Sequence, residues 1–305
     1  MAARADELSV VNASPFSYYA DANVFEARVT QPIRLNTDDV NYVKIERDPG
    51  HILHPAALLS AKQKYFSYSS AFSELSAQYD AANEGYRTTA TGTVTDLNIL
   101  NVVTADKVVG QLSTFYPEGN AVPSVTFAGT QFVNLRINGQ PLALNENLGI
   151  FGAKPAGDGS YFDDAAVLSA ISAQYYAIVN DPALPASVKS EYTWSPAAAN
   201  SMNALECSLI DGVSASTGAA FGNVIVVPGF GQIFLAEVEL GRTPDPNSPD
   251  SCDYMFRLEM IRVELQGLGS GRVKIIALDT NGQGSGGGGG PKPTHPPKKP
   301  KQPAQ

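Results

Sequence analysis

The sequence predicts a mainly β protein, a β-sandwich or jelly-roll-like arrangement of antiparallel sheets with one accessory helix. Two observations lead to this class. Segments in which apolar and polar residues alternate recur through the chain, and turn-forming residues separate them. Only one long stretch, Phe162–Val179, has clear helical spacing. Because a strand with one apolar side must bury it against another layer, we expect two packed sheets.

Strand patterns dominate the first half of the chain. Asn138-Gly139 is a hairpin signal, because a type I′ turn needs a positive φ at both central residues. Pro32 interrupts the first segment, which therefore reads as two short strands or as an edge strand. The expected strands are Val24–Leu35, Asn41–Glu46, Thr91–Val103, Lys107–Thr114, Phe132–Ile137 and Gln140–Leu144.

The last third of the body repeats this pattern, with expected strands at Asn223–Val227, Gln232–Leu240, Tyr254–Leu265 and Arg272–Leu278. The alternation slips once, near Met260 and Ile261, which predicts a β-bulge. The helix between these two regions begins after Asp163 and Asp164, where the helix dipole favours acids, and stops before Pro182. A second helix is predicted from Pro55 to about Lys64.

The chain divides into a β-rich body, residues 1–281, and a tail, residues 282–305. The tail is rich in glycine and then in proline and lysine, and it carries no large apolar side chains. Such a composition cannot offset the entropy of ordering, so we expect a disordered tether. Its lysines could contact an acidic polymer, or the segment could be a solvated spacer. The first residues lack the apolar run of a signal peptide, so the chain is either cytoplasmic or a mature, trimmed form.

Charge narrows the possible partners of the body. Taking the four tail lysines from the 21 basic residues leaves 17 against 30 acids, a net charge of −13. This balance argues against nucleic acid, whose affinity for proteins comes from lysine and arginine on phosphates. No apolar run approaches the roughly 20 residues of a membrane helix, so no membrane insertion is expected.

Several short motifs resemble the bacterial secreted-protein domain called choice-of-anchor P. They are Thr91-Gly-Thr-Val-Thr-Asp-Leu-Asn-Ile-Leu100, Val103-Thr-Ala-Asp-Lys-Val-Val109, Phe132-Val-Asn-Leu-Arg-Ile-Asn-Gly-Gln-Pro141 and Val227-Pro-Gly-Phe-Gly-Gln-Ile-Phe-Leu235, with Phe256–Leu278 similar to the closing strands. The resemblance covers roughly residues 91–144 and 223–278. It implies an exported β-rich domain attached to the cell through its C-terminus. Against that pattern, residues 152–222, which hold the helix, are an insertion.

Three sets of side chains are candidate sites. Cys207 and Cys252 are expected to form a disulfide if the chain is exported, with two reduced, buried thiols as the alternative. Asp245, Asn247, Asp250 and Asp253 share a proline-rich loop and could bind calcium, although acidic loops are often merely solvated. Tyr192 and Trp194 lie in the insertion, where they either bind a sugar or a partner, or anchor the insertion by burial.

Catalytic motifs are absent from the sequence. His51 and His54 form a His-x-x-His pair without further ligands, between Gly50 and Pro55, which predicts structural or solvated histidines in a loop. We therefore expect no enzyme and no cofactor other than the possible calcium. The favoured function is a secreted, cell-surface structural or adhesive protein that self-assembles into a fibre or lattice, or binds an extracellular or cell-wall partner. The alternatives are a carbohydrate-binding module and a polysaccharide-acting enzyme.

Overall fold

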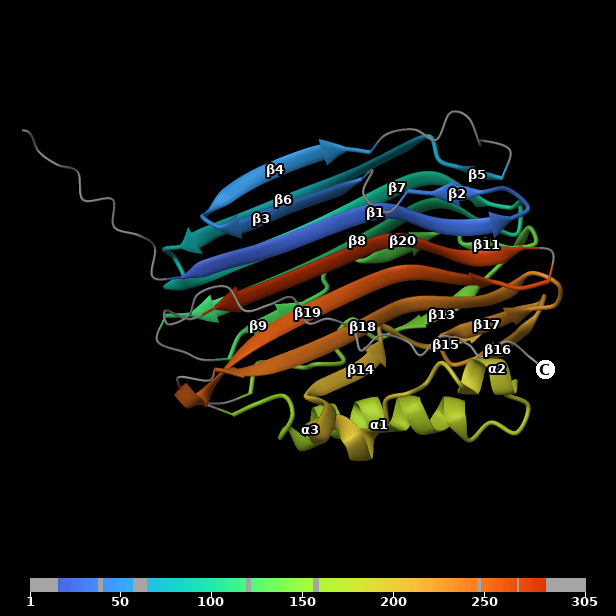
Figure 1. Ribbon diagram of the computed structural model, residues 1–305. Coiled ribbons are helices and arrows are strands. Elements are labelled where there is room, and N and C mark those ends of the chain that lie inside the picture. Colours follow the sequence, from blue (N-terminus) through green and yellow to red (C-terminus); the bar gives the residue numbers. More distant parts are fainter. Residues whose placement is uncertain are drawn as a thin grey trace, which may run out of the picture.

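The computed structural model describes residues 16–37, 41–56, 65–118, 122–155, 159–245, 248–267 and 269–283, and Figure 1 shows their arrangement. The side chains of 244–251 and 281–283 are not part of that description. Two large antiparallel sheets face each other, so the predicted sandwich is confirmed. We call them sheet A and sheet B.

Sheet A joins the two ends of the body. In spatial order it contains β16 (Ala219–Phe221), β17 (Val224–Val227), β18 (Gly231–Asp245), β19 (Ser248–Leu265), β20 (Ser270–Gln283), β1 (Ser17–Gln31) and β2 (Leu35–Asn36). Two further strands pair with members of this row, β14 (Ala204–Ser208) with β18 and β3 (Tyr42–Arg47) with β1. The first and last long strands, β1 and β20, are thus neighbours in this sheet, with β20 fifth and β1 sixth in the row of seven.

Sheet B comes from the first half of the chain. Its main row is β12 (Gln140–Pro141), β11 (Arg136–Ile137), β8 (Val103–Pro117), β7 (Gly85–Ile99), β6 (Ser70–Asp80) and β4 (Gly50–Pro55). Off this row, β5 (Phe66–Ser67) pairs with β7, while β9 (Ser124–Thr126) and β10 (Gln131–Val133) pair with β8. A separate small sheet joins β13 (Ala143–Glu146) to β15 (Ile210–Ser214).

The slip in alternation that the sequence shows at Met260 has a different cause from a bulge. Leu235 pairs with Ile261 and Glu237 with Glu259, so the register on the two sides of Met260 is the same. A bulge would offset one strand by a residue. Instead, the pairing is interrupted at one level, and Ala236 and Ile276 there have positive φ angles of 48° and 57°. The prediction of a slip is confirmed, but its interpretation as a bulge is wrong.

This interrupted level, which we call the crease of sheet A, crosses four strands at Val24, Ile276, Met260 and Ala236. All four side chains are buried in the main core. They face a glycine pair in sheet B, Gly92 opposite Gly110. A Cβ atom on Gly92 would lie 2.6 Å from Ile276 Cγ2, and one on Gly110 would lie 2.8 Å from the same atom. The missing side chains therefore make room for the crease.

Replacing Gly92 by alanine is expected to lower the free energy of unfolding by about 1–3 kcal/mol, because overpacking displaces Ile276. Urea denaturation measures the change. Gly149→Ala is the matched control, since nothing lies within 4 Å of a Cβ there. In the double variant Gly92→Ala/Ile276→Ala, the measured loss of unfolding free energy should be smaller than the sum of the losses in the two single variants. Additive losses would contradict the contact.

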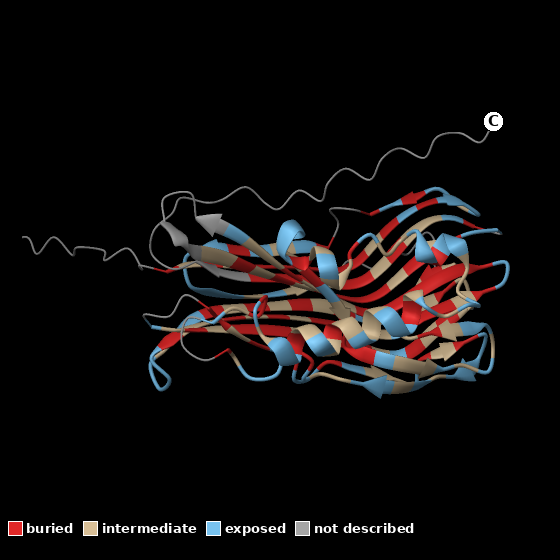
Figure 2. Ribbon diagram, turned by 90° about the horizontal axis from the view of Figure 1, so that it is seen from below, coloured by how far each residue is buried: buried red, intermediate tan, exposed pale blue. Residues whose placement is uncertain are grey.

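The predicted insertion closes one side of the sandwich, the lower side in Figure 1 and the near side in Figure 2. The predicted helix is confirmed as α1 (Ala165–Val179), whose N-cap Asp164 accepts hydrogen bonds from the N–H groups of Ala166 and Val167. Val167 and Ile171 enter the main core. Between α1 and β14 lie α2 (Ala186–Lys189), η2 (Pro196–Ala198) and α3 (Ala199–Met202).

Three local predictions differ from the structure. His51 and His54 belong to β4 and not to a loop, because six residues from Gly50 pair with β6. Pro55 ends that strand and does not start a helix; the rest of the predicted helix, 57–64, lies outside the described residues. Gly282 and Gln283, assigned by sequence to the tail, belong to β20. The tail from 284 onward lies outside the described residues.

Candidate functional site: two surfaces of the sandwich

Trp194 is an anchor within the insertion. Its side chain is only 3% exposed, and its ring meets that of Tyr175 on α1 edge to face, 5.8 Å between centroids. Its indole N–H donates a hydrogen bond of 2.7 Å to the carbonyl oxygen of Ala204, in β14. Tyr192 packs with Val188, Val224 and Phe234, and burial raises the pKa of its hydroxyl. This placement supports the anchoring alternative over a sugar platform.

The predicted disulfide is contradicted, because Cys207 and Cys252 are free thiols. Cys207 lies opposite Val238 of β18, whereas Cys252 lies opposite Pro244 of the same strand. Six residues of strand separate those positions, about 20 Å at roughly 3.3 Å per residue. A disulfide needs Cα atoms within about 7 Å. Burial raises the pKa of the Cys207 thiol, which keeps it protonated and unreactive.

The calcium hypothesis falls largely outside the described residues. Asp245 and Ser248 pair where β18 and β19 meet, but residue 247 and the side chains of Asp245 and Asp250 are not described. Asp253 is described, on β19. Within the described part of the chain, no group of three or more histidine, cysteine, aspartate or glutamate side chains is arranged to hold a metal ion.

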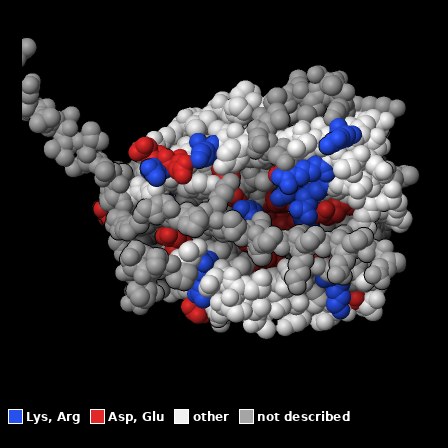
Figure 3. Space-filling view, in the orientation of Figure 1, with Lys and Arg blue, Asp and Glu red and all other residues white. Residues whose placement is uncertain are grey.

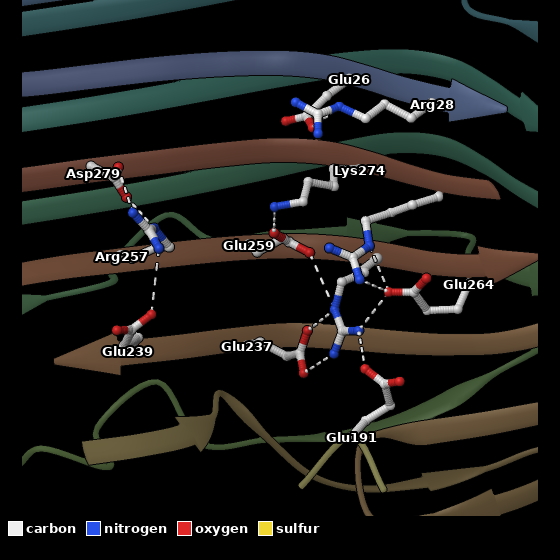
Figure 4. Close-up of polar contacts among 12 residues, drawn as sticks. Glu26, Arg28, Glu191, Glu237, Glu239, Arg257, Glu259, Glu264, Lys274 and Asp279 are labelled. Atoms are coloured by element: carbon white, nitrogen blue, oxygen red, sulfur yellow. Dashed lines mark hydrogen bonds and ion pairs between the residues drawn. The ribbon is translucent and has the colours of Figure 1, made fainter. Parts of the chain in front are cut away.

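A charged network covers the outer face of sheet A (Figure 4). Its centre is Arg262 on β19, whose guanidinium donates two hydrogen bonds of 2.7 Å to Glu237 and one of 3.0 Å to Glu264. The same guanidinium lies 3.8 Å from the centroid of the Phe234 ring, a cation–π contact. Arg262 thus joins β18 to β19 by charge and by packing.

Arg257 and Lys274 extend the network toward β20, and Arg272 of β20 donates a hydrogen bond to Glu264. Arg257 donates hydrogen bonds of 2.7 and 3.2 Å to Asp279 on β20 and one of 3.4 Å to Glu239 on β18. Lys274 Nζ lies 2.7 Å from Glu259 Oε2. Figure 3 shows basic and acidic atoms interleaved on this face. Sequence alternation placed charges on these strands, but only the strand order shows which of them meet.

Glu259 is the most buried acid of the network, 6% exposed. Burial alone would raise its pKa, but Lys274 and Arg262 outweigh burial and hold the pKa below its usual range. A general acid needs the opposite shift, so that a proton is available near neutral pH. The Glu259 carboxylate therefore has the character of an ion-pair partner of Lys274 and Arg262.

Acid should weaken the fold through Glu259. A carboxyl group with a lowered native pKa stabilises the protein above its unfolded pKa, near 4.5, and this stabilisation is lost as the pH falls through the native value. We expect the melting temperature to decrease once the pH is lowered below about 4.5. In Glu259→Gln the same titration should give a shallower fall. Equal slopes in the two proteins would show that Glu259 does not contribute.

An open strand edge is the second surface. Among the described residues, β4 pairs only with β6, and it forms the outer edge of sheet B (Figure 1). The side chain of Leu53, in the middle of β4, is 61% exposed. His51 Nε2 lies 2.9 Å from Glu74 Oε1 of β6, and both side chains are exposed. An uncovered edge with an apolar side chain is a template for strand addition.

The described surface also has one shallow depression of about 420 Å³ beside the start of α1, lined in part by Phe151, Lys154, Asp164 and Val167. Its two charged side chains already have partners, because Asp164 caps α1 and Lys154 donates to the carbonyl oxygen of Pro155. No helix in the described ranges combines the length and apolar character that crossing a bilayer requires.

The chain belongs to the family described as Domain of unknown function (DUF8256), whose model matches residues 16–241, more than half of the sequence. That range includes sheet B, the insertion and the first part of β18 but not β19 or β20. No curated protein and no solved structure matches the chain. The family match leaves the resemblance to choice-of-anchor P as a prediction.

Proposed function

We propose that this protein is a structural or adhesive protein of the cell surface that associates with copies of itself. The observation that carries the proposal is the edge of β4, which pairs with no described strand other than β6 and carries the exposed side chain of Leu53. Addition of a strand there would satisfy the backbone groups and cover the apolar side chain. The tail from 284 onward would hold the body at the surface, in keeping with its composition.

The arrangement of side chains favours this function over the alternatives. Trp194, the best candidate for stacking on a sugar ring, is buried against Tyr175 and Ala204. The clustered carboxylates on sheet A pair with arginine or lysine, which argues against a pair of acids for glycoside hydrolysis. An extracellular location is supported by the resemblance to an exported domain.

Sedimentation of the purified full chain over a range of concentrations tests the proposal, with electron microscopy of the same samples and a hydrolysis screen on polysaccharides. We expect association that grows with concentration, and no turnover. A strict monomer that hydrolyses a glycan would reverse the assignment in favour of an enzyme.

A further inference from the structure

Alternate residues of β4 direct their backbone groups toward β6 and toward the open edge. The N–H of Ala56, just after the strand, donates to the carbonyl oxygen of Ala71 in β6. Because successive residues of a strand point their backbone groups to opposite sides, His54 and Ile52 also face β6. His51, Leu53 and Pro55 therefore direct their backbone groups away from the sheet. Pro55 has no N–H, so His51 and Leu53 supply the donors that no described strand covers.

Both faces of β4 carry an apolar side chain. Ile52 packs against the main core, and Leu53 on the other face is 61% exposed. A strand that covers this edge well needs apolar residues on both of its own faces, which means adjacent apolar residues. Residues 7–12 of this chain, Glu-Leu-Ser-Val-Val-Asn, have that pattern, because Val10 and Val11 would point to opposite faces.

The N-terminal segment and the open edge originate at the same end of the sandwich. Tyr18, at the start of β1, pairs with Arg47 at the end of β3, and β4 begins three residues later at Gly50. The 15 residues before Phe16 span at most about 50 Å when extended. A six-residue strand needs about 20 Å of that length, so the segment can reach a second copy that meets this end.

We propose that the strand covering β4 is the N-terminal segment, residues 1–15, of a second copy, and that two copies exchange these segments reciprocally. This inference rests on the proposed self-association. Suppose that two copies meet at the ends where β1 and β4 begin. The N-terminal segment of one copy, the donor, then runs from residue 1 back toward its own body. The β4 strand of the other copy, the acceptor, runs away from the contact between the two copies. The pairing is therefore antiparallel, like every other pairing of sheet B. Because donor and acceptor share one end, the exchange closes a twofold dimer.

Two variants of the full chain separate donor from acceptor. Deleting residues 1–15 removes the donor and leaves β4 unchanged. Leu53→Pro removes an outward-facing N–H without removing a bond to β6, so it blocks the acceptor and keeps the donor. Leu53→Ala is the control for the side chain, since it keeps the N–H. The melting temperature of each variant, measured at a concentration where the wild type is monomeric, checks that the body is folded.

Sedimentation gives the expected pattern. The wild type and Leu53→Ala form dimers, each of the two blocking variants alone is a monomer, and their equimolar mixture forms a heterodimer through one exchanged strand. Association that survives in both blocking variants overturns the exchange but leaves self-association standing. A polymer larger than a dimer that both variants abolish overturns the reciprocal closure. A wild type that stays monomeric at every concentration overturns both the exchange and the proposed function.

Discussion

Replacing Arg262 by methionine is expected to lower the free energy of unfolding by about 3 kcal/mol, measured by urea denaturation. Removing one partner of a buried ion pair costs roughly 3–5 kcal/mol, because the other charge stays buried and unpaired. The Arg262 side chain is only 13% exposed, and its guanidinium pairs with Glu237, Glu259 and Glu264. We expect the lower end of this range, because Glu259 is still paired with Lys274, and Glu264 with Arg272, after the substitution.

Arg28→Met is the matched control. The Arg28 side chain is 66% exposed and its Nε lies 3.8 Å from Glu26 Oε1, so losing this pair should cost less than about 1 kcal/mol. The double variant Arg262→Met/Glu237→Gln should recover part of the Arg262→Met loss, because it also removes the stranded carboxylate. Equal losses for the two arginines would mean that the network on sheet A is solvated and contributes little.

Trp194→Ala is expected to cost about 3–5 kcal/mol, as for other buried aromatic residues cut back to alanine. The loss should come from the contacts between α1 and β14, because Trp194 connects these two elements through Tyr175 and Ala204. Trp194→Phe keeps a ring but loses the indole N–H, so its cost should be nearer 1 kcal/mol for the lost hydrogen bond.

Fluorescence gives an independent check, because Trp194 is the only tryptophan in the chain. We expect the native protein to emit at short wavelength and to resist quenching by acrylamide. Soluble oligosaccharides should leave the spectrum unchanged. A red-shifted, easily quenched emission that responds to a sugar would instead place Trp194 on a binding surface.

The sequence predicts the fold class because alternation along a strand reports directly which side is buried. Strands such as β7 and β8 are rich in β-branched residues, and α1 carries the three- and four-residue apolar spacing of a helix facing a core. Strand order is not local information, however. The residues around Cys207 and Cys252 do not show where the two cysteines lie in the sheet. Each lies opposite a residue of β18, and those two residues are six positions apart.

Neither of the two surfaces could be predicted from the sequence, because both depend on which strands are neighbours. Arg262 and Glu237 are 25 residues apart in the chain, and only the pairing of β18 with β19 brings them together. The edge position of β4 depends on β6 being its one described neighbour. Its Gly50 and Pro55 boundaries favour a loop on local propensity, which tertiary pairing overrides.

The adjacency of β1 and β20 has a consequence for how the chain folds during synthesis. The strands of sheet B lie within residues Gly50–Pro141, so they can pair while the rest of the protein is still being made. β1 leaves the ribosome first, but its long partner β20 leaves among the last. During that interval the apolar inner face of sheet B has no complete layer to cover it, so we expect the nascent chain to be most exposed to aggregation before β20 emerges.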